Sequence, residues 1–162
     1  MCINLKNKTS SEQIDKMSTK EMDFNATFGG LYSKKAGIMT LNAGEEKQLF
    51  LPSIMSYNNV ILGMNTITII ENGIYKISNF ISLRSMDKNF INVFFSTKKN
   101  GQNLEDLFHY ILVGNSFKEI SSTAILSLQA GDIIELVLGS AFGGSLFFGI
   151  GLSASLTVFK VA

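Results

Sequence analysis

The stretch from Thr66 to Leu83 reads TITIIENGIYKISNFISL. Its first five residues are all threonine or isoleucine, and β-branched side chains favour a strand. The Asn72-Gly73 pair then predicts a turn, because both residues tolerate the backbone angles that tight turns need. After the turn, large apolar side chains share one face at Tyr75, Ile77, Ile81 and Leu83. This period of two predicts a second strand with one buried face.

The same pattern of short strands and turn signals continues through the rest of the chain from Phe24 onward. Further strands are predicted at residues 26–32, 48–51, 90–97, 107–113, 121–128 and 133–138. Turns are predicted at residues 42–44, 98–101, 114–116 and 129–132. No segment of this region shows a convincing helical period. With a long final strand, this makes about eight to ten strands and predicts an all-β sandwich or barrel.

Composition and charge exclude several classes of protein. The chain has 162 residues, of which 46% are hydrophobic and 17% charged, so it can fold around a core and is not intrinsically disordered. This length predicts one folded domain, at residues 23–162. The formal net charge of +1 removes the usual argument for a nucleic-acid or acidic-membrane partner.

The single cysteine and the single histidine limit the chemistry further. Cys2 cannot form a disulfide within the chain, and a metal site with several cysteines or histidines is impossible in one subunit. His109 lies in an apolar strand, and we interpret it as an ordinary strand histidine rather than a member of a catalytic triad. We therefore expect no catalytic residue, no cofactor and no metal. A calcium ion between Glu105, Asp106 and Asp87 stays open, although their spacing matches no known calcium loop.

Two segments of the sequence bear on whether the protein is secreted or inserted in a membrane. Residues 1–9 lack the long apolar run of a secretory signal, and residues 1–22 are predicted to be a flexible arm, with a short helix capped at Ser10 as the alternative. Residues 136–159 carry no charge over 24 positions, which is long enough for a membrane-spanning helix. From Leu146 onward, however, the strict alternation predicts a β-hairpin that turns at residues 142–145, and we expect no membrane span.

The final predicted strand, residues 146–159, has two different faces. Large apolar side chains occupy the even positions from Leu146 to Val158 and are expected to face the core. The odd positions inside the strand are small and uncharged: Gly149, Gly151, Ser153, Ser155 and Thr157. Ser78, Asn79 and Ser82 extend this character onto the strand at 74–83. A face in free contact with water usually carries charges, so we expect these five residues at an oligomer interface, with a neutral solvated surface as the alternative.

Three blocks of the sequence resemble a known family. Residues 71–78, ENGIYKIS, resemble the G-x-Y-x-I/F-S strand of C1q/TNF-like jelly rolls, and residues 126–136, LSLQAGDIIEL, resemble their L-x-L-x-x-G-D-x-I-x-L hairpin. The ending ASLTVFKVA, residues 154–162, is similar to the closing strand of the bacterial branch. That branch includes domains of collagen-like spore-surface glycoproteins (the BclA type) and small exosporium basal-layer proteins (the ExsF/BxpB type). Residues 24–26, near the start of the domain, resemble the second of these groups. The resemblance covers residues 24–162.

The resemblance implies a ten-stranded jelly roll assembled as a homotrimer, with the sheet of the first and last strands turned toward the threefold axis. It also implies a structural role at a spore surface or exosporium, contacts with other spore-surface proteins, and no catalysis. Because the sequence has neither a Gly-X-Y collagen run nor a proline-rich exosporium leader, a small stand-alone protein is expected rather than a stalked glycoprotein.

A lectin-like or receptor-binding head is the second function that the sequence leaves open. Glycan-binding sites often present exposed Trp or Tyr to sugar rings. This chain has no Trp and four Tyr, at positions 32, 57, 75 and 110. Because Tyr75 and Tyr110 fall in predicted strands, the sequence favours the structural role over glycan binding.

Overall fold

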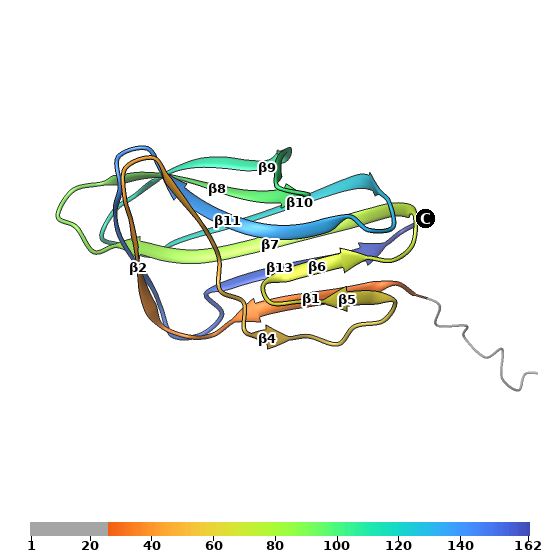
Figure 1. The fold of residues 1–162 in the computed structure, drawn as a ribbon. Helices are drawn as coiled ribbons and strands as arrows, with labels where there is room; N and C mark the ends of the chain where they lie inside the picture. Colours follow the sequence, from red (N-terminus) through yellow and green to blue (C-terminus); the bar gives the residue numbers. More distant parts are fainter. Residues whose placement is uncertain (1–25) are drawn as a thin grey trace, which may run out of the picture.

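The computed structural model describes residues 26–162, which form a sandwich of two antiparallel β-sheets (Figure 1). The strands are β1 (Phe28–Ser33), β2 (Gly37–Leu41), β3 (Glu45–Gln48), β4 (Ser53–Ile54), β5 (Val60–Leu62), β6 (Thr66–Ile69), β7 (Gly73–Ser85), β8 (Ile91–Lys99), β9 (Gln102–Val113), β10 (Lys118–Leu128), β11 (Ile133–Ser140), β12 (Gly144–Phe148) and β13 (Ala154–Lys160). The described residues contain no helix that could cross a membrane. The arm predicted at residues 1–22 and Cys2 lie outside the described residues.

The long strand β7 organises the seven-stranded sheet, which we call sheet A. Along one edge β7 pairs with β10 over its length. Along the other edge it pairs with β13 near its start and with β12 near its end. Strands β1 and β4 continue the sheet beyond β13, and β2 continues it beyond β12. The first and last strands of the described chain therefore lie side by side in sheet A.

The six-stranded sheet, sheet B, has the order β5-β6-β11-β8-β9, and β3 also pairs with β11. Strands β8 and β9 form a hairpin whose turn contains Asn100 and Gly101, with φ values of +52° and +78°. This confirms the turn predicted at residues 98–101, because Asn and Gly are the residues that tolerate two successive positive φ values. A bulge between Ser96 and Lys98 interrupts the pairing of the two strands near this turn.

The hydrophobic core fills the space between the two sheets. Tyr75, Ile77, Ile81 and Leu83 of β7 are all fully buried, which confirms the alternation predicted for this strand. The core also contains a polar link between the sheets, formed by Asn79, Thr97 and Ser122. The Asn79 side chain donates a hydrogen bond from Nδ2 to Thr97 Oγ1 (2.8 Å) and accepts one at Oδ1 from Ser122 Oγ (2.7 Å). Asn79 therefore faces the core and does not extend the outer face as predicted.

Three connections that look like hairpins in the sequence pass from one sheet to the other. The chain passes from sheet B to sheet A between β6 and β7, and back to sheet B between β10 and β11. It passes to sheet A again between β11 and β12. The hairpins expected around residues 129–132 and 142–145 are therefore wrong as pairings, although the chain does turn there. Such crossings between two Greek-key sheets define a jelly roll, and the C1q/TNF-like jelly-roll class is confirmed.

The final strand is divided into two pieces. Strands β12 and β13 both lie along β7, and residues 149–152 between them leave the sheet. The backbone of Ser153 already bonds to Ser33 of β1 and Ser82 of β7. Leu146, Leu156 and Val158 are buried as predicted, whereas Ile150 is 94% exposed in the loop. The single long strand predicted at 146–159 is therefore wrong in its middle. Strict alternation in sequence cannot report that the chain bulges away from its partner at this point.

Candidate functional site

The outer face of sheet A, which points away from sheet B, is the candidate functional surface. It is formed by every second residue of β1, β13, β7 and β10, because the alternate residues on the same strands fill the core. Its side chains are mainly hydroxylic or apolar: Phe28, Tyr32, Ser155, Thr157, Phe159, Ile74, Ser78, Phe80, Ser82, Ser121, Thr123, Ile125 and Ser127. The charged residues at the same alternate positions are Lys76, Arg84 and Glu119. The pairs Ser78–Thr123 and Thr157–Ser78 are hydrogen-bonded across neighbouring strands.

A groove of about 660 Å³ lies in this face, along β1 and β13. Phe28, Met55, Thr157 and Phe159 are among the residues that line it. Gly30 forms part of its floor, because a Cβ atom there would lie 2.7 Å from the Met55 sulfur and 2.9 Å from Thr157 Cγ2. A glycine thus lets two strands and the Met55 side chain approach closely.

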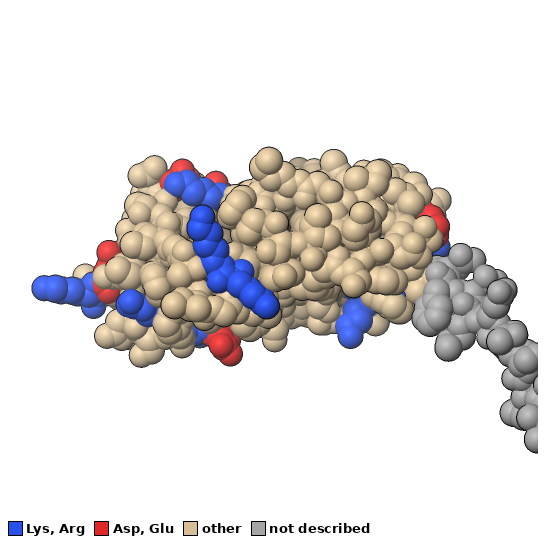
Figure 2. Space-filling view, turned by 90° about the horizontal axis from the view of Figure 1, so that it is seen from below, with Lys and Arg blue, Asp and Glu red and all other residues tan. Residues whose placement is uncertain are grey.

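The uncharged character continues around the edge of the sandwich. Figure 2 views the molecule from the side of β1, β4 and β5, and shows few Lys, Arg, Asp or Glu side chains over the half nearer the C-terminus. Ile54, Tyr57, Ile61 and Met64, on or beside β4 and β5, are between 56% and 83% exposed. A contiguous apolar surface of this kind marks an interaction site more often than a free surface.

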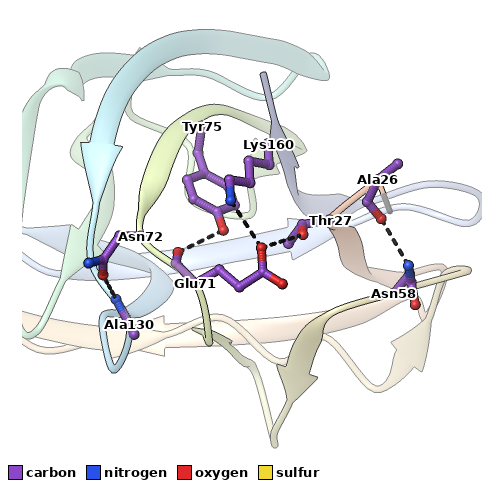
Figure 3. A network of polar contacts seen from close by, with 8 residues as sticks. All are labelled: Ala26, Thr27, Asn58, Glu71, Asn72, Tyr75, Ala130 and Lys160. Atoms are coloured by element: carbon purple, nitrogen blue, oxygen red, sulfur yellow. Dashed lines mark hydrogen bonds and ion pairs between the residues drawn. The ribbon is translucent and has the colours of Figure 1, made fainter. Parts of the chain in front are cut away.

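A cluster of polar contacts closes the end of the sandwich beside the groove (Figure 3). The Glu71 carboxylate, before β7, lies 3.0 Å from Lys160 Nζ at the end of β13 and accepts a hydrogen bond from Thr27 Oγ1 (3.4 Å). The buried Tyr75 hydroxyl donates to the Glu71 carbonyl oxygen (2.9 Å). Burial raises the pKa of Tyr75. These contacts join the starts of β1 and β7 to the end of β13.

Two amide side chains extend this cluster on either side. Asn58 donates from Nδ2 to the carbonyl oxygen of Ala26 (3.1 Å), and the Ala130 amide donates to Asn72 Oδ1 (2.8 Å). The members of the cluster are carboxylate, ammonium, amide, hydroxyl and backbone groups engaged with one another. The cluster therefore has the form of a structural clamp that holds the groove's end rigid, rather than of a reaction centre.

The opposite end of the outer face carries Arg84, the single arginine of the chain. Its guanidinium carbon lies 4.9 Å from the Phe147 ring centroid and 5.8 Å from that of Phe117. Gly149 makes room for the second ring, since a Cβ there would lie 2.8 Å from Phe117. This cation–π arrangement covers the arginine with apolar surface.

The structure separates the five residues that the sequence places at an interface. Ser155 and Thr157 lie half-buried on the outer face of β13, next to the groove. Gly149 and Gly151 belong to the loop between β12 and β13. Ser153 is only 2% exposed and donates from Oγ to the Ser33 carbonyl oxygen (3.1 Å), so the expectation that it points outward is wrong. Its backbone pairs it with β1, which turns it inward.

The remaining candidates for chemistry do not gather at one place. His109 lies on β9 opposite Phe95, and its Nε2 is buried without a hydrogen-bond partner. Glu105 and Asp106 lie on β9, whereas Asp87 accepts a hydrogen bond from the Ser145 amide near the other end of the sandwich. Among residues 26–162, no three His, Cys, Asp or Glu side chains are grouped as metal ligands.

An aromatic cluster on the outer face of sheet B escaped the sequence reasoning. The rings of Phe94 and Phe108 are stacked with centroids 5.6 Å apart, and Tyr110 meets both edge-on. Phe94 lies over Gly139, where a Cβ would be 2.1 Å from the ring. Tyr110 is 76% exposed although it lies within a strand. The alternation of residues 107–113 already indicates that Tyr110 faces away from the core.

No protein-family model and no curated protein matches this sequence. Among solved structures, the chain is similar to the crystal structure of murine APRIL, a jelly roll of the TNF family, with a TM-score of 0.55 and 13% sequence identity. The match covers 84% of this chain and 99% of that chain. At this identity the likeness shows a shared TNF-like jelly-roll fold.

Proposed function

We propose that this protein is a non-enzymatic structural protein that assembles as a homotrimer through the outer face of sheet A. The observation that carries the proposal is the chemistry of that face, where hydroxyl, phenyl and isoleucine side chains predominate and Lys76 is the one charged residue that lines the groove. Covering such a surface removes apolar area from water at little cost in desolvated charge. The resemblance to C1q/TNF-like jelly rolls supports a threefold arrangement.

The mass in solution, measured by light scattering after gel filtration, tests the proposal directly. About three times the chain mass of 17.8 kDa is expected. Thr157→Arg should reduce this mass to that of one chain, because it would bury an unpaired charge in the groove. Asn92→Arg, on the exposed outer face of sheet B, is the matched control and should remain trimeric. A monomeric wild-type chain would contradict the proposal.

We place this trimer in a spore-surface layer of the exosporium type. The support is the similarity of residues 154–162 to the closing strand of the bacterial branch, together with the exposed apolar edge along β4 and β5, which a protein layer could cover. Immunogold labelling of spores of the source organism, with a deletion strain as the control, tests this location. Label confined to the interior of the spore or to vegetative cells would contradict it.

A glycan-binding head is the second candidate, and the aromatic cluster of sheet B favours it. Tyr110 stands exposed beside Phe94 and Phe108, on the sheet opposite the proposed interface, so the rings would remain accessible in a trimer. Aromatic faces of this kind can stack on the apolar face of a sugar ring. Reproducible binding on a glycan array at micromolar protein, abolished by Tyr110→Ser, would overturn the purely structural assignment.

A further inference from the structure

A cavity of about 220 Å³ opens where β1 ends and β2 and β13 begin. It lies between the two sheets, because its lining combines residues of β1, β2, β12 and β13 in sheet A with Leu49 and Phe50, which follow β3 of sheet B. Leu49, Phe148 and Ala154 belong to the hydrophobic core, whereas Ile38 and Phe50 are exposed. The cavity therefore leads from an apolar mouth into the core of the sandwich.

Three polar side chains contribute to the cavity wall beside β1. Ser153 is already satisfied, because its Oγ donates to the Ser33 carbonyl oxygen (3.1 Å). The buried Ser33 Oγ accepts a hydrogen bond from the Lys35 backbone amide (3.3 Å), and no atom in the described part of the chain accepts its proton. The exposed Lys35 ammonium likewise forms no ion pair or hydrogen bond within residues 26–162. None of the described lining residues is acidic, so a hydroxyl donor and a positive charge remain available to a ligand.

The size and the chemistry of the cavity define the class of ligand. An apolar cavity of about 150 Å³ accommodates one benzene ring, so this cavity has room for about nine non-hydrogen atoms. Its apolar walls match a hydrocarbon chain, and a carboxylate has two oxygens that accept hydrogen bonds from a hydroxyl and an ammonium at once. We propose that the cavity binds a small amphiphilic carboxylate of the medium-chain fatty acid type, with its tail in the core and its carboxylate at Ser33 and Lys35.

Gly37 offers a way to fill the cavity without disturbing the fold. A Cβ atom at this position would meet no other atom within 4 Å, and its φ is not positive. Position 37 shares one face of β2 with Met39 and Leu41, which pack against the core, so a longer side chain would enter the cavity. Gly37→Leu should therefore weaken the binding of octanoate, the probe, at least about twentyfold, because its side chain takes about half of the room. Gly37→Ala, which adds only a methyl group, is the matched control and should stay within about threefold of the wild type.

Changes in the ligand and in Lys35 test the head group. Octanol has a chain of the same length without the charge and should bind at least about tenfold more weakly than octanoate. Butyrate should bind at least about 50-fold more weakly, because four fewer methylenes leave water. Lys35→Met keeps the apolar stem and should weaken octanoate at least about tenfold, while octanol stays within about threefold. Lys88→Met, the same change in the exposed loop between β7 and β8, is the control and should bind octanoate like the wild type.

Methyl NMR of the full chain with labelled methionine gives both the affinity and the place of binding. Among the methionines of residues 26–162, only Met39 lines this cavity, whereas Met55 lines the groove of sheet A. Octanoate should shift the Met39 methyl signal, assigned through Met39→Leu, in a saturable manner at or below millimolar concentration. The Met55 signal should stay unchanged.

Circular dichroism verifies that each variant is folded. A Met39 signal that octanoate does not shift would refute the site. A shift confined to Met55, or a Gly37→Leu variant that binds octanoate like the wild type, would place the binding elsewhere and refute it too. Octanol that binds as tightly as octanoate would refute recognition of the carboxylate. The cavity shares no lining residue with the outer face of sheet A defined above, so these results are independent of the proposed trimer.

Discussion

Replacing Asn79 with alanine should destabilise the fold strongly, because this side chain joins the two sheets inside the core. Asn79 is 3% exposed and Thr97 is fully buried, so water cannot replace the bonds that are lost. The amide makes three hydrogen bonds, to Thr97 Oγ1 and from the hydroxyl and the backbone amide of Ser122. Each bond contributes about 1 kcal/mol net, and the orphaned hydroxyl and amide groups add the cost of their own desolvation.

The expected loss is therefore about 3–4 kcal/mol in the free energy of unfolding, a large part of the stability of a domain of this size. Replacing the whole group, as Asn79→Leu with Thr97→Val and Ser122→Ala, should recover more than half of that loss. No side-chain polar atom of the group is then left unpaired, and the leucine adds buried apolar area. The comparison separates the cost of unpaired polar groups from the cost of a cavity.

Urea unfolding followed by circular dichroism measures both variants, at one fixed protein concentration because assembly would shift the midpoint. Ser78→Ala, the neighbouring position on the outer face, is the control and should cost less than about 1 kcal/mol. An Asn79→Ala variant within about 1 kcal/mol of the wild type would refute the role of the network. A triple variant as unstable as the single one would show that packing, not hydrogen bonding, is the cause.

Three further predictions concern single buried groups. The raised pKa of Tyr75 means that its contribution to stability is complete below about pH 10, the ordinary tyrosine value, and is lost as the pH rises above it. Urea unfolding midpoints measured between pH 8 and 11 should therefore fall more steeply for the wild type than for Tyr75→Phe. Equal slopes for the two proteins would contradict this. His109→Leu should raise the free energy of unfolding by about 1 kcal/mol, since it removes a buried nitrogen without a hydrogen-bond partner. A lower free energy of unfolding in urea would contradict this and would mean that the imidazole packs better than leucine. Gly139→Ala should lower the free energy of unfolding by about 2 kcal/mol, because the new Cβ would overlap the Phe94 ring. The near-ultraviolet circular dichroism spectrum should also change, since the aromatic cluster is disturbed. An unchanged spectrum would disprove this.

Much of the candidate surface could be inferred from local alternation, and one residue shows where that inference ends. Thr157 faces outward because its neighbours Leu156 and Val158 fill the core, and a period of two is visible in sequence. Ser153 has the same parity and is nevertheless buried, because the chain leaves the sheet between β12 and β13 and returns against Ser33 of β1. The partner strand, 120 residues away in the chain, decides this, and no local pattern contains it.

Lys76 and Tyr110 show a second limit of inference from local alternation. Their outward orientation follows from the alternation of residues 74–83 and 107–113, but their significance depends on the absence of polar partners within the described chain and on which other side chains lie around them. Both properties are set by strand pairing across sheets A and B.

By itself the sequence determined the class of this protein, the position of its principal strands and the buried face of each. Side-chain period and turn residues act over a few positions, and they report local backbone conformation directly. The tertiary structure alone decided that residues 129–132 and 142–145 join different sheets, that β7 has three partners, and that the groove beside β13 is lined by residues of β1, β7 and β13 together. Those features depend on contacts between segments that are distant in the sequence. The total free energy of all these contacts decides which strands pair, and no short stretch of sequence contains that total.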